Sequence, residues 1–310
     1  MLTRRQLLGS ITVLGTNVFI PFPSVALQEG EPSRTAQGAA LLRAAHQLLE
    51  TPLVFDDPLA LRILGPQRRR LLESDLDRYR EPGSRALRAF IVVRSRFAED
   101  ELARSVSQGT RQYLVLGAGL DTFAYRNPHG ESLRVFEVDH PTTQDWKRRR
   151  LQDQGIDVPR SLSFVAVDFE KDSLADRLRS SGFRRDTPVF ISWLGVTVYL
   201  TREAVMQTLG FVARECAPGS RIVFDFAVPD GLLGEAERNR RDELSGRVAK
   251  LGEPWISYFD PQALAGDLLA VGFTGAVSLA ASALNERYFV GRADGFRVHG
   301  SSGRIMSAYT

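Results

Sequence analysis

Short apolar runs recur along the chain after residue 112, and each is followed by a polar or glycine-containing turn. Strands that are buried on both faces of a parallel sheet have such continuous apolar sequences. The runs expected to form buried strands are Tyr113–Leu116, Leu133–Val138, Leu162–Val167, Pro188–Trp193 and Arg221–Phe226. Two later segments, Gly272–Leu279 and Arg287–Val290, are expected to complete the sheet.

Helical periodicity dominates the part of the chain that precedes these runs. Its spacing predicts a helix over Ser33–Leu49, with Ser33 as the N-cap, and a longer helix over Arg85–Val106. Between them, Pro52–Leu64 predicts a turn and a short helix, with Asp57 as the start signal.

Together these elements predict an α/β protein with a doubly wound, Rossmann-like sheet and an N-terminal helical cap. We expect the cap over residues 27–108 and the sheet domain over residues 109–310. A long polar insertion, residues 229–260, follows the fifth run, and an insertion of this length is typical of a lid over a ligand site.

The first strand leads directly into Gly117-Ala118-Gly119, within the sequence QYLVLGAGLDTFAYR. Glycines after a strand allow a sharp turn and the close approach of a ligand to bare backbone. Asp121 and Thr122 are expected to cap a helix that starts near Phe123. Because the third glycine of a dinucleotide fingerprint is replaced here by Thr122, a tight turn without a ligand is the alternative.

An acidic residue, Asp139, ends the second strand, about 20 residues beyond the glycines, where a nucleotide ribose would present its hydroxyls. A carboxylate can accept two such hydrogen bonds at once. Glu137 shares its face of the strand. The alternative role for Asp139 is that of a helix N-cap before Pro141.

Four blocks in this order, LGAGLDTFAYR, FEVDHP, VAVDFEKD and ISWLGVTVYLTREAV, resemble the class I S-adenosylmethionine-dependent methyltransferases of the leucine carboxyl methyltransferase type. The likeness is strongest to their bacterial O-methyltransferase branch and extends from about Ser33 to the C-terminus. It implies S-adenosylmethionine as the cofactor and a sheet whose last strands pair antiparallel.

The resemblance also assigns roles to individual residues. It implies that Arg94 contacts the carboxylate of the methionine moiety, that Asp168 contacts the adenine amino group, and that Phe169 offers backbone N–H and an apolar face to the ring. The alternative for Arg94 is an ion pair with Glu99 or Asp100, and for Phe169 a place in the core. The eukaryotic members carry a glutamate where Leu194 stands, so a protein C-terminus as the substrate does not carry over.

Methyl transfer from a sulfonium mainly requires that donor and acceptor are held in line and dry. A carboxylate acceptor needs no general base, whereas a hydroxyl is helped by one. The candidate bases are His140, Asp121, Tyr125 and Tyr199, and none is assigned. We expect O-methylation of a small-molecule carboxylate or hydroxyl. The alternatives are an NAD-dependent oxidoreductase, which the incomplete fingerprint and the lack of a proton-relay motif disfavour, and a catalytically silent nucleotide-binding or secreted interaction protein.

Composition and charge restrict the kinds of partner and bound group that we expect. The formal net charge is only +3 and the arginines are scattered, so we expect no nucleic-acid partner. Cys216 is the only cysteine and the four histidines lack ligand spacing, so we expect neither an intrachain disulfide nor a metal site. The oligomeric state is not predicted.

The first 26 residues resemble a twin-arginine export signal. Arg4 and Arg5 precede an apolar stretch, Leu7–Ile20, and small residues at Ser24–Ala26 fit a cleavage site. The stretch is too short for a convincing membrane span, so no stable membrane insertion is expected. The alternative is a misassigned start codon, because the family is cytoplasmic by resemblance and its cofactor is made there.

Overall fold

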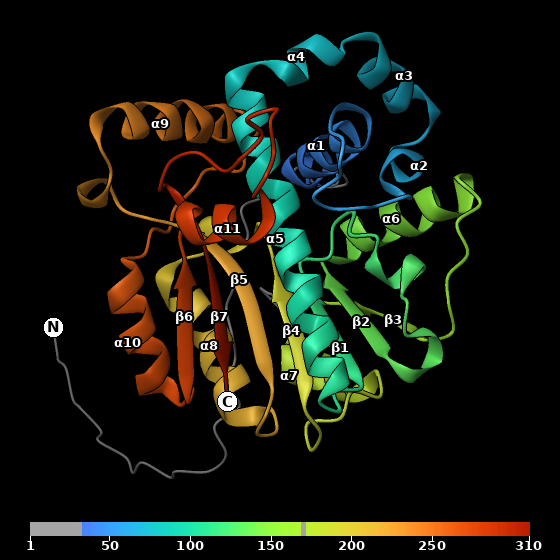
Figure 1. Ribbon diagram of the computed structural model, residues 1–310. Helices are drawn as coiled ribbons and strands as arrows, with labels where there is room; N and C mark the ends of the chain where they lie inside the picture. Colours follow the sequence, from blue (N-terminus) through green and yellow to red (C-terminus); the bar gives the residue numbers. More distant parts are fainter. Residues whose placement is uncertain (1–32, 169–171) are drawn as a thin grey trace, which may run out of the picture.

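The computed structural model describes residues 33–168 and 172–310, which form a seven-stranded sheet with helices on both faces (Figure 1). The predicted export segment, residues 1–26, and Phe169 lie outside the described residues. The sheet order is β3-β2-β1-β4-β5-β7-β6. The strands are β1 Gln112–Leu116, β2 Arg134–Asp139, β3 Leu162–Ala166, β4 Val189–Trp193, β5 Arg221–Ala227, β6 Gly275–Leu279 and β7 Gly303–Tyr309.

Strands β1 to β5 pair in parallel, whereas β7 runs antiparallel to both of its neighbours, β5 and β6. The chain crosses from β1 outward to β2 and β3, and then returns to the other side of β1 as β4. This reversal is the point at which ligands bind in doubly wound sheets, outside the carboxyl ends of the strands. The predicted fold class is confirmed.

One predicted strand is wrong. Residues 287–290 do not enter the sheet, because Arg287 and Tyr288 end helix α11 (Ala281–Tyr288), which packs against the long helix α5 (Pro82–Ser107). The Tyr288 hydroxyl donates to Asp100 at 2.9 Å, and the Arg287 guanidinium lies over the Phe97 ring. Contacts to α5 therefore outweigh the strand propensity of this short segment, and β7 completes the sheet instead.

The remaining helices sort by the face of the sheet that they cover. Helices α7, α8 and α10 share one apolar core with the sheet, and α5 and α11 share the other. Helices α1, α2, α3 and α6 contribute to a third, smaller core, which also includes Leu120 in the turn after β1. Besides α5 and α11, the bounds are α1 Arg34–Leu49, α2 Ala60–Leu64, α3 Pro66–Ser74, α4 Leu76–Arg80, α6 Pro141–Asp153, α7 Leu174–Ser180, α8 Arg202–Glu215, α9 Glu235–Ala249 and α10 Pro261–Val271.

Helix α1 begins as the sequence predicts, because the Ser33 hydroxyl accepts a hydrogen bond from the Ala36 amide at 3.1 Å. The predicted helix at Phe123 is instead a short 3₁₀ turn, η1 (Phe123–Arg126). Asp121 does accept the Phe123 amide, at 2.8 Å, so its role is to close that turn. In the described ranges 33–168 and 172–310, no helix has both the length and the apolar sequence that crossing a bilayer requires.

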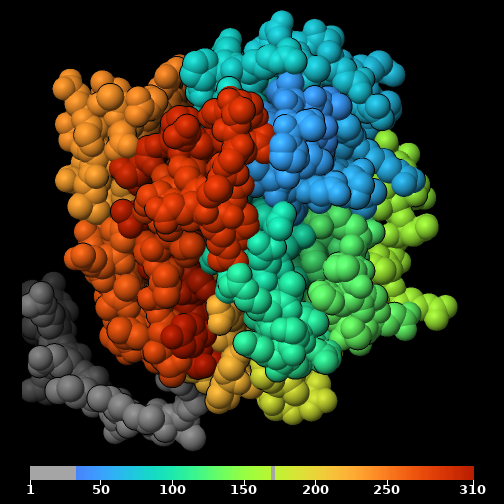
Figure 2. Space-filling model, in the orientation of Figure 1, coloured from blue at the N-terminus to red at the C-terminus, as the bar shows by residue number. Residues whose placement is uncertain are grey.

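The C-terminal loop between α11 and β7 lies against the N-terminal helices, and Figure 2 shows its red atoms beside the blue of α1. Arg292 donates to the Pro52 carbonyl at 2.5 Å, and Arg85 of α5 donates to the Asp294 carbonyl at 2.6 Å. The loop before the last strand and the N-terminal helices therefore stabilise each other.

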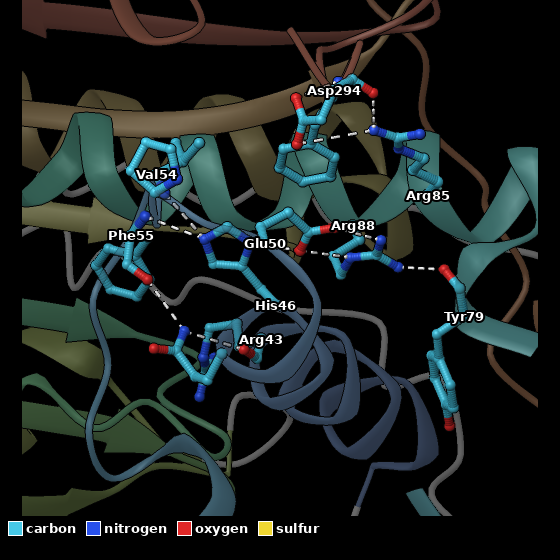
Figure 3. A network of polar contacts seen from close by, with 12 residues as sticks. Arg43, His46, Glu50, Val54, Phe55, Tyr79, Arg85, Arg88 and Asp294 are labelled. Atoms are coloured by element: carbon cyan, nitrogen blue, oxygen red, sulfur yellow. Dashed lines mark hydrogen bonds and ion pairs between the residues drawn. The ribbon is translucent and has the colours of Figure 1, made fainter. Parts of the chain in front are cut away.

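A buried polar network lies behind this contact (Figure 3). The His46 ring accepts the Val54 amide at Nε2, so its Nδ1–H donates to Glu50 at 2.8 Å. Arg88 donates bidentate hydrogen bonds to the same carboxylate, at 2.6 and 3.1 Å, and also donates to the Tyr79 carbonyl. Each of the three charged or titratable side chains is at most 6% exposed, yet each has its partners.

Candidate functional site

The glycine turn after β1 is held in place by its own amides. Gly117 and Ala118 donate to the Val138 carbonyl at 2.9 and 3.1 Å, and Gly119 donates to Asp139 Oδ2 at 2.6 Å. Because these N–H groups are used inside the protein, the turn offers a ligand mainly carbonyl oxygens. Such acceptors suit a cationic ligand group better than a phosphate.

Both glycines have positive φ, +66° at Gly117 and +44° at Gly119. A Cβ at Gly117 would lie 2.5 Å from Val196 Cγ2, and one at Gly119 would lie 3.1 Å from Ala36 Cβ. The first atom that a side chain at Gly119 would meet belongs to α1. The turn is thus packed between α1 and the loop after β4.

Asp139 ends β2 with both carboxylate oxygens held by backbone amides. In addition to the bond from Gly119, Oδ1 accepts the His140 amide at 2.8 Å. Burial raises the pKa of Asp139, and the two amide hydrogen bonds oppose that rise only in part. His140, not Asp139, caps α6, because its Nδ1 accepts the Thr142 amide at 3.3 Å. The oxygens of Asp139 retain lone pairs for further donors.

Glu137 lies two residues before Asp139, on the same face of β2, and is 1% exposed. Its Oε2 contacts Lys147 Nζ at 2.7 Å and accepts the Tyr125 hydroxyl at 3.1 Å. Among the described residues, its other oxygen, Oε1, is buried without a hydrogen-bond partner. Burial raises the pKa of Glu137 to about 7, although Lys147 acts in the opposite direction.

Arg94 of α5 reaches the site from the other side of β1. Its Nη1 donates to Asp225 Oδ2 at 2.7 Å, and Asp225 Oδ1 accepts the Gly195 amide at 2.6 Å. A Cβ at Gly195 would lie 2.8 Å from Arg94 Nη2, so the missing side chain makes room for the guanidinium. Within residues 33–168 and 172–310, Arg94 uses only Nη1 in this way, so further N–H donors remain for a carboxylate ligand.

The pairing expected as an alternative for Arg94 does not form. Glu99 binds Arg126 instead, at 2.8 Å, and Asp100 binds Arg96 at 2.9 Å. The Arg126 pair belongs to a network that fixes the chain after the glycines, in which Thr122 donates to Asp57 at 2.8 Å. Asp57, expected only to start a helix, therefore anchors the glycine turn to the N-terminal helices.

The predicted residues fall into one region. Asp139 and the glycine turn are hydrogen-bonded to each other, and Gly117 packs on Val196, next to Gly195 and hence to Arg94. Asp168 follows β3, the strand that pairs with β2, and its amide donates to Asp172 at 2.8 Å. Nothing is described of Phe169.

Each of the four candidate bases is already engaged. His140 caps α6 and Asp121 closes a turn. Tyr125 donates to Glu137, and burial together with that carboxylate raises the pKa of its phenol. The Tyr199 hydroxyl accepts the Trp255 indole N–H at 3.4 Å, and burial raises its pKa as well. These contacts favour no residue as a general base.

Two charged groups of this region were not predicted as site residues. Asp225 is 7% exposed within the strand sequence RIVFDFA, whose buried part is otherwise apolar, and a lone carboxylate in a buried strand is a usable signal. Glu253, in the insertion, hydrogen-bonds the start of α1. Its partner lies 219 positions away, so no local pattern marks it.

The donor and acceptor set can be tested against S-adenosylmethionine. That molecule carries a sulfonium, an ammonium, a carboxylate and a ribose diol. The region offers carbonyl oxygens and buried acids for the cations and hydroxyls, and one partly satisfied guanidinium, Arg94, for the carboxylate. The residues present therefore fit the cofactor.

Comparisons with known proteins agree with this geometry. The model of the leucine carboxyl methyltransferase family matches residues 36–213. YktD of Bacillus subtilis, which is named for S-adenosyl-L-methionine-dependent methyl transfer, is 32% identical over 289 residues, covering 86% of this chain and 95% of YktD. A similarly named protein of Parafrankia is 36% identical over 71% of this chain and 69% of its own length.

Solved structures support the fold alone. A crystal structure from Thermobifida fusca, described as that of a methyltransferase, has a TM-score of 0.56 at 16% identity and covers 92% of this chain and 97% of its own. A further structure, from Streptomyces avermitilis, has a TM-score of 0.54. The chain belongs to the leucine carboxyl methyltransferase family and is an S-adenosylmethionine-dependent methyltransferase.

Proposed function

We propose that this enzyme methylates an oxygen of a small molecule, with a carboxylate as the preferred acceptor. The observation that carries the proposal is the cover over the carboxyl edge of the sheet. The start of α1 packs on the glycine turn, and residues 255–257 of the insertion are hydrogen-bonded to the loop after β4. Such a cover favours a small acceptor over a folded protein partner.

The preference for a carboxylate rests on the candidate bases. A carboxylate acceptor is already anionic at neutral pH and needs no proton removed, whereas an alcohol or phenol does. His140 and Asp121 hold local backbone structure, and Tyr125 and Tyr199 have raised pKa values. A site without a poised base is suited to an acceptor that requires none.

Within this proposal the cofactor is held by the residues that the sequence singled out. Asp139 would accept the ribose hydroxyls, Arg94 would bind the carboxylate, and Asp168 with Phe169 would contact the adenine. When bound, S-adenosylmethionine supplies an electrophilic methyl group on a sulfonium. The chain's own part is to orient both reactants and to exclude water. The predicted cap, residues 27–108, and the insertion, residues 229–260, would cover the site, the insertion as its lid.

An acceptor screen with methyl-labelled S-adenosylmethionine tests the proposal. Small carboxylic acids, phenols, alcohols and peptides with a free C-terminus should be compared, with products assigned by mass spectrometry. We expect transfer to carboxylic acids, at a rate that varies little between about pH 6 and 9, where a carboxylate stays ionised. Transfer only to peptide C-termini, or to nitrogen or carbon, would contradict the proposal.

The Arg94 assignment has its own test. Arg94→Met should weaken binding of S-adenosylhomocysteine strongly and of adenosine hardly at all, because only the first carries the carboxylate. Arg184→Met, which removes an exposed guanidinium that pairs with Asp186 in the loop before β4, is the matched charge control. Equal losses for both ligands would point to a packing defect instead.

A further inference from the structure

The carboxylate of Glu253 is seated on the start of α1. Its Oε1 accepts the Arg34 amide at 2.9 Å, and its Oε2 accepts the Thr35 amide at 3.2 Å and the Ser33 hydroxyl at 3.2 Å. The Thr35 hydroxyl donates to the same oxygen. Glu253 is only 7% exposed. A residue of the insertion thus caps the helix that opens the described chain.

These bonds supply what α1 cannot provide for itself. The first amides of a helix have no partner within it, and a negative charge near them is favourable. Ser33 satisfies the Ala36 amide, which leaves those of Arg34 and Thr35 to Glu253. Removal of the carboxylate would therefore leave the first turn of α1 without its cap.

The first turn of α1 also forms a wall of the proposed cofactor site. Ala36 lies next to Thr35, and its Cβ is 3.1 Å from the position of a Cβ on Gly119. The glycine turn, in turn, is bonded to Asp139. The position of the first turn of α1 decides how much room remains beside the glycine turn.

The residues that follow Glu253 are fastened to the opposite side of the site. The Ile256 amide donates to the Val198 carbonyl at 2.7 Å, and the Ser257 hydroxyl donates to the Leu200 carbonyl. The Trp255 indole donates to the Tyr199 hydroxyl, which is also hydrogen-bonded to Thr35. The connection runs from the glycine turn through α1 and Glu253 to the loop after β4, and so spans the carboxyl edge.

We propose that Glu253 is a positioning residue, whose hydrogen bonds to the start of α1 hold that helix against the glycine turn. We call this set of hydrogen bonds the clasp, and it opens whenever cofactor and product exchange. The inference rests on the proposed cofactor site. It adds that exchange is limited by opening of the clasp, and that the rates of binding and release are coupled through one carboxylate.

The test compares Glu253→Ala with Glu243→Ala in the full-length chain. Glu243 lies on α9 of the same insertion, is exposed and pairs only with its helix neighbour Arg247 among the described residues. Rapid-mixing and chase experiments with labelled S-adenosylmethionine give the association and dissociation rates. In Glu253→Ala both rates should rise about tenfold, the scale of one charge-assisted hydrogen bond, while Kd changes less than either rate. Glu243→Ala should match the parent enzyme.

Hydrogen exchange without any ligand separates the clasp from the cofactor assignment. The amides of Arg34 and Thr35 should exchange faster in Glu253→Ala than in the parent chain. Faster exchange with unchanged binding rates would overturn the gating role, and unchanged exchange would overturn the clasp itself. A parent enzyme that binds no S-adenosylmethionine would instead overturn the assigned site. If Glu253→Ala does not fold, Glu253→Gln, which keeps the volume and loses the charge, gives the same contrasts at smaller amplitude.

Discussion

Glu50, among the N-terminal helices, and Glu137, beneath the carboxyl edge of the sheet, are both buried glutamates, yet their pKa values move in opposite directions. Burial alone would raise the pKa of Glu50, but hydrogen bonds from His46 and Arg88 outweigh it and lower the pKa. At Glu137, burial outweighs the ion pair with Lys147, and the pKa rises to about 7.

The difference lies in how completely each carboxylate is paired. The Glu50 carboxylate receives donors at both oxygens, as Figure 3 shows, whereas one oxygen of Glu137 has no hydrogen-bond partner among the described residues. A saturated carboxylate stabilises a fold and has little left to offer a ligand. An undersaturated carboxylate retains acceptor capacity for a further donor. The comparison therefore contrasts a carboxylate that holds helices together with one that keeps acceptor capacity beneath the carboxyl edge of the sheet.

The saturated region should be the more costly to break. Arg88→Met leaves Glu50 buried without its ion-pair partner and without both hydrogen bonds from the guanidinium, and we expect the free energy of unfolding to fall by about 3–5 kcal/mol. Chemical denaturation measures this. Arg69→Met, which breaks the exposed pair with Glu73, is the control and should cost less than about 1 kcal/mol. Equal small losses in the two variants would mean that the Glu50 network contributes no more than a surface pair.

A substitution at the carboxyl edge of the sheet should weaken cofactor binding more than it lowers the stability of the fold. Asp139→Ala removes the side chain that accepts the Gly119 amide, and we expect binding of S-adenosylhomocysteine to weaken by about 2–4 kcal/mol. Titration calorimetry gives the affinity and thermal unfolding gives the stability. Unchanged affinity in a folded variant would remove Asp139 from the site.

Substitutions at Gly117 and Gly119 should have smaller effects, and these are effects on the stability of the fold. Gly117→Ala should destabilise the protein by about 1–3 kcal/mol, because the new Cβ would press on Val196, and Gly119→Ala should cost less. The double variant Gly117→Ala, Val196→Ala should recover part of the loss. If it recovers nothing, backbone strain at positive φ, rather than the contact, explains the cost.

The remaining prediction concerns the pH dependence of the stability of the fold. The folded chain holds a proton on Glu137 between about pH 4.5 and 7, because its pKa is raised above the usual 4.5, and the unfolded chain does not. Stability from this group therefore falls as pH rises through that window. The parent chain should lose stability relative to Glu137→Gln as pH is raised from 5 to 8, as measured by denaturation at each pH. A constant difference would contradict the raised pKa.

Much of the fold follows from local pattern. Continuous apolar runs predicted the five parallel strands, and Ser33 and its spacing predicted α1. The last strand was missed because residues 287–290 have strand-like side chains, whereas their actual position depends on Asp100 and Phe97 of α5. Contacts between distant parts of the chain decided the outcome there.

The residues of the candidate site also divide into those that the local sequence marks and those that it does not. The residues that follow strands, such as Gly117, Gly119 and Asp139, are marked by their place in the sequence and meet at one edge of the sheet. Asp225 and Glu253 are defined by partners far away in the chain, Arg94 and the start of α1. A sequence reveals the groups that topology brings together, but not the partners that hold them in place.

The capping of α1 by Glu253 bears on the order in which the protein takes shape during synthesis. Helix α1 leaves the ribosome long before its cap, which follows 219 positions later. At about 5–20 residues per second, that separation corresponds to roughly 10–40 seconds of translation. During this interval the first turn of the helix lacks the carboxylate that caps it. The contact between this helix and the insertion can therefore form only after most of the chain has been translated.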